Sequence, residues 1–424
     1  MKKSLIIGIV SAILVVILIC VLIFGGSANE KETETETTTT ACQHEEITLL
    51  SMVSATCTKT GLTEGKKCKL CGTMITPQEI IPKGAHLNFR LKNDGTYEVT
   101  GQKSYCNCTT ISIPNTYENK KVTSININTF RNNTKIKNIT IGSNITTIPS
   151  FAFSRCTSLE TVSIPSSVKY VDGSAFEYCS SLKSIKIPNP DASVGVGAFS
   201  NCSSLKTATL PSNLKVIANS LFENCTALKT VNIGTSATEI QSKAFYRCLG
   251  LTSIDIPDSV TNIGDEAFYY CFNLTELTIP DSVTTIGKSA FEECTKLKKI
   301  TIGKSVTTIK DYAFRKCEAV ETIVFNALPE YYYPTFKNLK TIIINDGVST
   351  IPKGAFHYCS KVTSITIPSS VTYIGSDSLQ FMNSSSENIT YTGTIEQWHS
   401  ITKGLYYGLG SSSTVNCIDG TTTG

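Results

Sequence analysis

Histidine and tryptophan are rare in this chain, which has four His and one Trp among 424 residues. Catalysis that depends on histidine therefore has few places in the sequence. Charged residues make up only 17% of the chain, the net charge is +4, and no block of Lys and Arg forms the basic footprint that nucleic acid needs. Residues that favour helices are scarce, whereas Asn, Ser, Thr and Ile are abundant, and this composition favours strands and turns. The composition excludes nucleic acid as a partner and predicts a mostly β fold.

One long apolar run lies at the N-terminus. Residues 5–24 contain no charged side chain, and Lys2 and Lys3 precede them. About 20 apolar residues suffice to cross a bilayer core. The two lysines should stay in the cytoplasm, which places the rest of the chain outside the cell.

We interpret residues 1–28 as a cytoplasmic stub and a single-pass transmembrane anchor. A cleaved signal peptide is the alternative, because Gly26 and Ala28 suit a cleavage site, and the protein would then be secreted. Residues 29–41 have no apolar periodicity and read as a flexible spacer.

A 23-residue period dominates the middle of the chain. Its clearest mark is a cysteine at every step: Cys156, Cys179, Cys202, Cys225, Cys248, Cys271, Cys294 and Cys317. Phenylalanine stands three residues before each cysteine, from Phe153 to Phe314, and Leu or Val stands three residues after it.

The period continues beyond these eight steps. Phe130 and Asn133 hold the Phe and Cys slots one period earlier. Phe336 takes the Cys slot before a full period has passed since Cys317, and Cys359 follows one full period later, so one turn is trimmed. We count about eleven turns, with a fold of the α/β repeat-solenoid type that is mostly β.

Within one turn, residues 181–188 predict a short strand. Leu182, Ile185 and Ile187 should face inward with polar residues between them, and Pro188 should stop the strand. The rest of the turn must return over the other face. One turn cannot bury its apolar side alone, whereas stacked turns can.

We interpret the cysteines of this column as buried side chains that pack in the core. A redox role is the alternative. Stacked turns place Cβ atoms about 4.8 Å apart and pointing the same way, whereas a disulfide needs facing Cβ atoms about 3.8 Å apart. Asn133 and Phe336 in the same slot also favour packing.

The repeat Ile279–Ile302 resembles the leucine-rich repeat of the BspA-like (Treponema pallidum type) surface proteins, over about residues 110–390. The resemblance implies repeats over 108–390, a β-hairpin cap over 87–107 and a C-terminal cap over 391–424. It also implies an adhesin that binds a protein or another cell surface. A structural scaffold of the cell envelope with no host partner is the alternative.

Three lysines line up on the outward side of the predicted strands, on what we expect to be one continuous concave sheet. They are Lys183, Lys206 and Lys229, with Lys298 further along the same column. Stacked ammonium groups favour an anionic partner, while ordinary solubilising charge is the competing interpretation.

Residues 42–86 carry a different pattern, rich in cysteine and histidine. Cys68 and Cys71 in CKLCG have the spacing of a zinc knuckle. The predicted ligands of a structural zinc ion are His44, Cys57, Cys68 and Cys71, with Cys42 and His86 as substitutes. Disulfides are the alternative, because this segment would lie outside the cell.

No catalytic pattern emerges from the sequence. The segment Gly195–Phe199 lacks the third glycine of a phosphate loop, and His357 and His399 are isolated. We therefore expect a binding protein and not an enzyme. Glycan binding is a weaker idea, since it calls for an ordered row of surface aromatics, which the sequence does not suggest.

Overall fold

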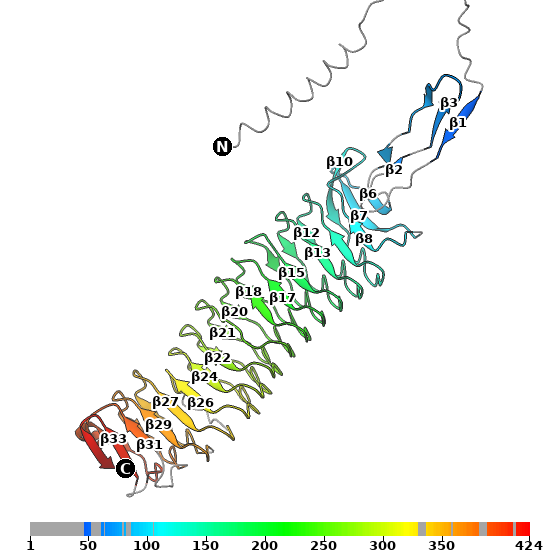
Figure 1. Ribbon diagram of the computed structural model, residues 1–424. Helices are drawn as coiled ribbons and strands as arrows, with labels where there is room; N and C mark the ends of the chain where they lie inside the picture. Colours follow the sequence, from blue (N-terminus) through cyan, green and yellow to red (C-terminus); the bar gives the residue numbers. More distant parts are fainter. Residues whose placement is uncertain are drawn as a thin grey trace, which may run out of the picture. The chain divides into compact units, whose positions relative to one another are not determined.

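Two compact units make up the chain in the computed structural model, one of Met1–Leu49 with Lys66–Thr76 and one of Leu50–Gly65 with Pro77–Gly424. Figure 1 traces both. The structure describes residues 46–51, 61–62, 64–78, 80–81, 86–104, 106–329, 336–357, 359–380, 388–409 and 413–424.

The first unit is built around a small sheet of order β1-β3-β4. Its strands are β1 (Ile47–Leu50), β3 (Gly65–Cys68) and β4 (Met74–Thr76), and β3 and β4 are antiparallel. In the second unit, β2 (Gly61–Leu62) pairs with β5 (Ile80–Ile81).

The repeats are preceded by an antiparallel hairpin of β6 (Leu87–Leu91) and β7 (Tyr97–Gln102). Gly95 has a φ of 78° in the hairpin turn, a conformation that glycine adopts without steric cost. β10 (Lys120–Ile125) then pairs in parallel with β7 and antiparallel with β9 (Thr116–Tyr117). The hairpin thus starts the stacking that the coils continue.

Most coils of the second unit contribute one strand to each of two sheet faces (Figure 1). The first sheet face carries β8 (Thr110–Ser112), β11 (Asn138–Thr140), β13 (Thr161–Ser163), β15 (Ser184–Lys186), β17 (Thr207–Thr209), β19 (Thr230–Asn232), β22 (Glu276–Thr278), β24 (Lys299–Ile302), β26 (Thr322–Phe325), β27 (Thr341–Ile344), β29 (Ser364–Ile367), β31 (Asn388–Tyr391) and β33 (Thr414–Cys417).

The second sheet face is made of two-residue strands. They are β12 (Thr147–Ile148), β14 (Tyr170–Val171), β16 (Ser193–Val194), β18 (Val216–Ile217), β20 (Glu239–Ile240), β21 (Asn262–Ile263), β23 (Thr285–Ile286), β25 (Thr308–Ile309), β28 (Thr350–Ile351), β30 (Tyr373–Ile374) and β32 (Thr402–Lys403). Neighbouring strands on both faces are parallel, so identical slots of successive coils stand side by side.

The predicted strand pattern within one coil is confirmed. Leu182, Ile185 and Ile187 are each at most 3% exposed, while the polar residues Ser184 and Lys186 of β15 face solvent. The shortened turn is also confirmed, because β26 and β27 pair with Thr322 opposite Thr341, which is less than one full period further along the chain.

Two expectations about the array were wrong. The solenoid has about 13 turns, and not about eleven. The first sheet face is not one continuous sheet either, because its strand pairing divides into three sheets, broken between β13 and β15 and between β19 and β22. The ladder of strand hydrogen bonds is therefore interrupted at these two places, although the hydrophobic core continues through them.

The phenylalanines of the repeat form a file through the core. From Phe130 to Phe314, neighbouring ring centroids are 5.0–5.7 Å apart and the ring planes differ by 4–21°. Seven consecutive rings, Phe153 to Phe291, are completely buried. Each ring is thus sandwiched between the rings of the two adjacent coils.

The cysteines of the repeat are buried thiols that pack beside this file, as the packing interpretation predicts. Each also donates its S–H to the carbonyl oxygen of the phenylalanine one coil earlier, at S···O distances of 3.1–3.5 Å. The Phe153 oxygen, for example, accepts from the Cys156 N–H and from the Cys179 thiol. The thiol therefore satisfies the second lone pair of a buried carbonyl.

Each coil turns through a corner that contains the Phe and Cys slots, and this corner repeats an unusual backbone. Ser174 and Tyr178 have φ values of 54° and 59°, and the same two slots are left-handed in most other coils. The N–H groups of Ser174, Phe176 and Tyr178 all donate to the following coil. The corner is thereby held rigidly to its neighbour.

The array ends in a helix and an antiparallel strand. α2 (Ile395–Ser400) begins with a capping box at Thr394 and buries Trp398 completely. β34 (Gly420–Thr423) then runs antiparallel against β33. No helix among the described residues is both long and apolar enough to cross a bilayer, and the predicted anchor, residues 1–28, lies outside those residues.

Candidate functional site

The lysines predicted to bind a partner stand in one file on the first sheet face. The Lys206 N–H donates to the Lys183 oxygen and the Lys229 N–H to the Lys206 oxygen, each at 2.9 Å. All three side chains are exposed. We call Lys183, Lys206 and Lys229 the lysine column. Three like charges on adjacent coils create a local positive potential that favours an anion.

Among the residues that the structure describes, only the first lysine of the column forms an ion pair with a carboxylate. Lys183 forms an ion pair with Glu160 of the preceding coil. The hydrogen bond and charge of Lys183, with a smaller effect from Lys137, lower the pKa of the Glu160 carboxyl. Within the described part of the chain, no carboxylate forms an ion pair with the Lys206 or Lys229 ammonium groups. The uncompensated charge is therefore at these two lysines.

A shallow hollow of about 350 Å³ lies beside the start of the column. Glu160, Ser181, Lys183, Ser204 and Lys206 line it. Its hydroxyl and ammonium groups can donate hydrogen bonds to a carboxylate or similar anion.

Lys298 belongs to the same file but lies apart from the column. Thr252 and Thr275 occupy the two intervening coils, and the Lys298 N–H donates to the Thr275 oxygen at 2.8 Å. Its side chain is exposed. It therefore adds charge to the face but does not extend the hollow.

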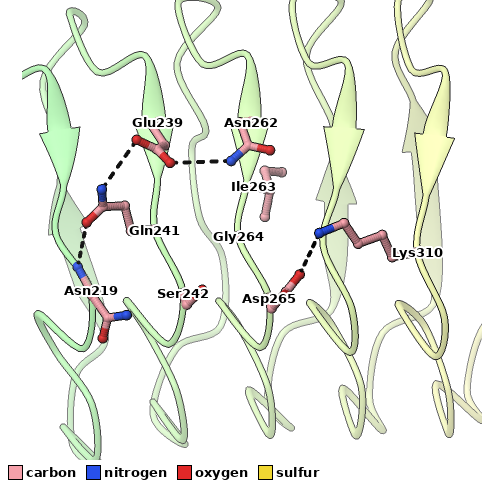
Figure 2. Close-up of a pocket in the computed structure, with 9 residues that line it drawn as sticks. All are labelled: Asn219, Glu239, Gln241, Ser242, Asn262, Ile263, Gly264, Asp265 and Lys310. Carbon is pink, nitrogen blue, oxygen red and sulfur yellow. Dashed lines mark hydrogen bonds and ion pairs between the residues drawn. The ribbon is translucent and has the colours of Figure 1, made fainter.

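A second hollow, of about 350 Å³, lies on the second sheet face (Figure 2). It is lined by Asn219, Glu239, Gln241, Ser242, Asn262, Ile263, Gly264, Asp265 and Lys310. Gly264 occupies a slot where an added Cβ would meet the Ser242 nitrogen at 2.6 Å, so close coil contact requires glycine here.

The polar groups of this second hollow bind one another. Glu239 accepts from Gln241 and from Asn262, and Gln241 accepts from the Asn219 N–H. Asp265 accepts from the Lys310 ammonium, 3.2 Å away, as Figure 2 shows. The hollow therefore presents a satisfied polar network and no nucleophile paired with a base.

The pKa of Asp265 reflects the balance in this network. Partial burial favours the neutral carboxyl, but the Lys288 backbone N–H and the Lys310 ammonium outweigh it, so the pKa of Asp265 is lowered. The carboxylate stays ionised and paired, which suits a structural role.

The predicted zinc ligands fall into different parts of the chain. Cys42, His44 and Cys57 lie outside the described residues, and His86 belongs to the second unit. Among the residues that the structure describes, no three His, Cys, Asp or Glu side chains gather as a metal site would require.

Cys68 and Cys71 flank the tight turn between β3 and β4. The Cys68 N–H donates to the Thr73 oxygen at 2.9 Å, and the Gly72 N–H donates to the Cys68 oxygen at 3.1 Å. Gly72 has a φ of 74°. Cys68 is buried and Cys71 is exposed. The structural zinc ion stays a prediction.

One feature of the corners was missed from the sequence. Two adjacent coils carry a short row of surface aromatics, which we did not expect from the sequence. The Tyr246 and Tyr269 rings stack there with their centroids 5.1 Å apart. The signal that could have found it is their separation by one full repeat period.

Comparison with known proteins agrees with this architecture. A family model described as the BspA type leucine rich repeat region matches residues 101–229, 217–338 and 326–422. No curated protein sequence matches the chain.

Several solved structures are similar. A leucine-rich repeat protein from Bacteroides ovatus is 25% identical, with a TM-score of 0.52, over 78% of this chain and 98% of that chain. A leucine rich cell surface protein from Faecalibacterium prausnitzii is 31% identical, with a TM-score of 0.44, over 75% of this chain and 96% of that chain. The leucine-rich repeat protein of T. pallidum is 18% identical, with a TM-score of 0.32, over 58% of this chain and 86% of that chain.

The family model covers well over half of the chain. These matches fall on the same stacked coils in which the Phe and Cys files lie. This chain belongs to the BspA-type leucine-rich repeat family.

Proposed function

We propose that this protein is an extracellular interaction module, anchored at the cell surface, that acts as an adhesin through its solenoid. The observation that carries the proposal is the lysine column, a positive file beside a hollow on an exposed sheet face, in which Lys206 and Lys229 form no ion pair within the described residues. Rigid repeat arrays present long surfaces that suit protein partners.

The family supports this class of function. The similar protein from Faecalibacterium prausnitzii is described as a cell surface protein. The apolar run at residues 5–24 would hold the chain at the membrane, with the coils outside the cell.

We propose that the lysine column binds a carboxylate-rich surface of a protein partner. Ammonium groups at exposed sites act over about 10 Å at moderate salt, so they steer an acidic partner and set its association rate. Lys298 would extend the same attraction along the face.

Replacing Lys183, Lys206 and Lys229 together by Glu should weaken binding of the chain to cells and matrix proteins at least about tenfold, because attraction becomes repulsion. The measurement is surface plasmon resonance with the full chain in detergent at two salt concentrations. The control replaces Lys215, Lys288 and Lys353 by Glu, since these are equally exposed lysines away from the column. Equal loss in both variants would refute a specific role of the column.

The second candidate is a scaffold that organises other envelope components. The satisfied polar network of the second hollow favours a purely structural surface on that face. A pull-down with the full chain separates the two functions. Host or neighbouring-cell proteins support the adhesin, and proteins of the same cell envelope alone support the scaffold.

For the segment 42–86 we propose a structural zinc ion held by Cys68 and Cys71 with two of the other predicted ligands. The tight turn at Gly72 brings the two cysteines onto one loop, as a zinc knuckle needs. A metal would also stabilise a segment too short for a large core.

The purified full chain should therefore contain about one zinc ion, and Cys68→Ser and Cys71→Ser should each lower the zinc content to near zero. Inductively coupled plasma mass spectrometry gives the metal, and mass spectrometry after alkylation gives the disulfides. Cys417→Ser is the control, because this partly exposed cysteine lies at the far end of the array. A disulfide at Cys68 or Cys71 without zinc would establish the alternative.

A further inference from the structure

A cluster of aromatic side chains occupies the corner of two adjacent coils. Tyr246 and Tyr269 stack with an angle of 7° between their ring planes, and Tyr270 lies 5.7 Å from Tyr269. Phe272 follows on the same coil, and all four side chains are partly exposed. In the preceding coils the slot of Tyr246 and Tyr269 holds Ser154, Glu177, Ser200 and Glu223, while the slot of Tyr270 holds Asn201 and Asn224 and, once, a tyrosine, Tyr178. The repeat itself therefore does not require aromatics here.

Two cations lie against the rings of this cluster. The Arg247 guanidinium, from the coil of Tyr246, lies 5.4 Å from the centre of the Tyr270 ring. The Lys296 ammonium, from the following coil, lies 5.6 Å from the centre of the Phe272 ring. Both side chains are exposed. We call Tyr246, Tyr269, Tyr270, Phe272, Arg247 and Lys296 the corner patch.

These two cations differ from others of the same corner. On the next coils Arg315 pairs with Glu292, and Lys316 pairs with Glu293. Neither Arg247 nor Lys296 pairs with a carboxylate in the described residues, and Lys296 donates only to the Asn273 side-chain oxygen at 2.6 Å. Within the described part of the chain, no ion pair therefore neutralises these two charges of the corner patch.

The backbone beneath the patch is held in place. Arg247 and Tyr270 have φ values of 57° and 64°. The backbone N–H of Arg247 donates to the backbone carbonyl oxygen of Tyr269 at 2.8 Å. The backbone N–H of Tyr270 donates to the backbone carbonyl oxygen of Glu292 at 2.9 Å. The backbone beneath the patch is therefore already fixed before a ligand binds, so binding need not order it.

We infer that the corner patch docks an acidic protein segment, one that carries carboxylates together with apolar or aromatic side chains. Tyr and Arg are enriched in the energetic centres of protein interfaces. A guanidinium stacked on a ring still offers its N–H groups for a bidentate bond with a carboxylate. The inference rests on the proposed function as an interaction module, and it assigns a second docking surface away from the lysine column.

A fluorescently labelled peptide of alternating Asp and Tyr is the probe, and a peptide of alternating Lys and Tyr is the charge-inverted control. We expect the full chain to bind only the acidic peptide. Arg247→Gln with Lys296→Gln should weaken binding about tenfold at low salt, through lost charge complementarity. Tyr269→Ala should weaken it severalfold at any salt, because stacked ring area is lost. Fluorescence anisotropy measures both effects.

The matched control is Lys215→Gln with Lys353→Gln, which removes two exposed charges away from both the corner patch and the lysine column. Unchanged peptide affinity in the corner variant, or an equal loss in the control variant, overturns the inference. Binding of a sulfated polysaccharide in preference to the peptide, abolished by the corner variant, would also overturn it in favour of a glycan. Peptide binding that persists while the chain binds no cell or matrix protein would refute the adhesin function and leave the corner patch intact.

Discussion

Phe245→Ala should lower the free energy of unfolding by about 3–5 kcal/mol, the usual loss for a buried phenylalanine. Phe245 is fully buried and stacks on Phe222 and Phe268, with centroids 5.6 and 5.0 Å away. Deleting the ring leaves a cavity that the neighbours can fill only partly, since the backbone of each coil is hydrogen-bonded to the next. The measurement is urea denaturation followed by circular dichroism.

Tyr178→Ala is the matched control, because this corner tyrosine is 39% exposed and lies outside the file. We expect it to cost less than about 1 kcal/mol. Repeat arrays need not unfold in one step, so tyrosine fluorescence should be recorded in parallel. Equal losses in the two variants would show that the phenylalanine file does not hold the coils together.

The second large effect is alkaline unfolding driven by the thiol column. Burial raises the pKa of the Cys156 and Cys271 thiols to about 12, from a usual value of 9.0. Burial likewise raises the pKa of Cys179, Cys225, Cys248 and Cys294 well above that value. The folded chain therefore keeps protons that the unfolded chain releases above about pH 9.

The sign of the pH dependence follows from this difference. The unfolded state binds fewer protons between about pH 9 and pH 12, so stability falls as pH rises through that window. One pKa unit corresponds to about 1.4 kcal/mol, so each of Cys156 and Cys271 contributes roughly 4 kcal/mol that is complete below pH 9 and lost by about pH 12. Several thiols acting together should unfold the array well before that limit.

Urea denaturation at a series of pH values, with a reducing agent present, measures this slope. Replacing Cys248 and Cys271 by Ser removes two ionisable thiols and keeps a donor for the Phe carbonyls. The variant should lose stability less steeply above pH 9 than the parent chain. Identical slopes would mean that other groups cause the alkaline transition.

The core of this fold could be predicted from the sequence because its period is strict. Phe176, Phe199 and Phe222 recur at every step of that period, so any stacked arrangement must align them. The alternation of Leu182, Ile185 and Ile187 likewise defines the inward side of β15.

Other parts of each coil could not be predicted because they are too short to show a pattern. β16 and its counterparts on the second sheet face have two residues each, which cannot display a period of two. Some left-handed residues of the corner, among them Arg247 and Tyr270, are neither Gly nor Asn and so give no turn signal, although Asn201 and Asn224 hold the same slot in other coils. The S–H···O bonds depend on where the backbone carbonyl of the previous coil points.

The candidate sites could be predicted only where their residues follow the repeat period. The lysine column follows from a fixed strand slot, and the structure aligns it on one face. The corner patch combines slots from three coils, Arg247, Tyr270 and Lys296, and only the folded corner brings them together. The zinc prediction rests on spacing alone, since three of its candidate ligands lie outside the described residues.

The constant register between successive coils has a consequence for how such genes change. From Phe130 to Phe291, each coil offers its successor the same phenylalanine carbonyl and receives the same thiol, so a 23-residue segment duplicated within this stretch would find partners on both sides. The β6–β7 hairpin and the β33–β34 pair would be untouched by that insertion. Tandem duplication or deletion can thus lengthen or shorten the array in steps of about 4.8 Å, changing the distance of the lysine column and the corner patch from the ends of the array without altering either.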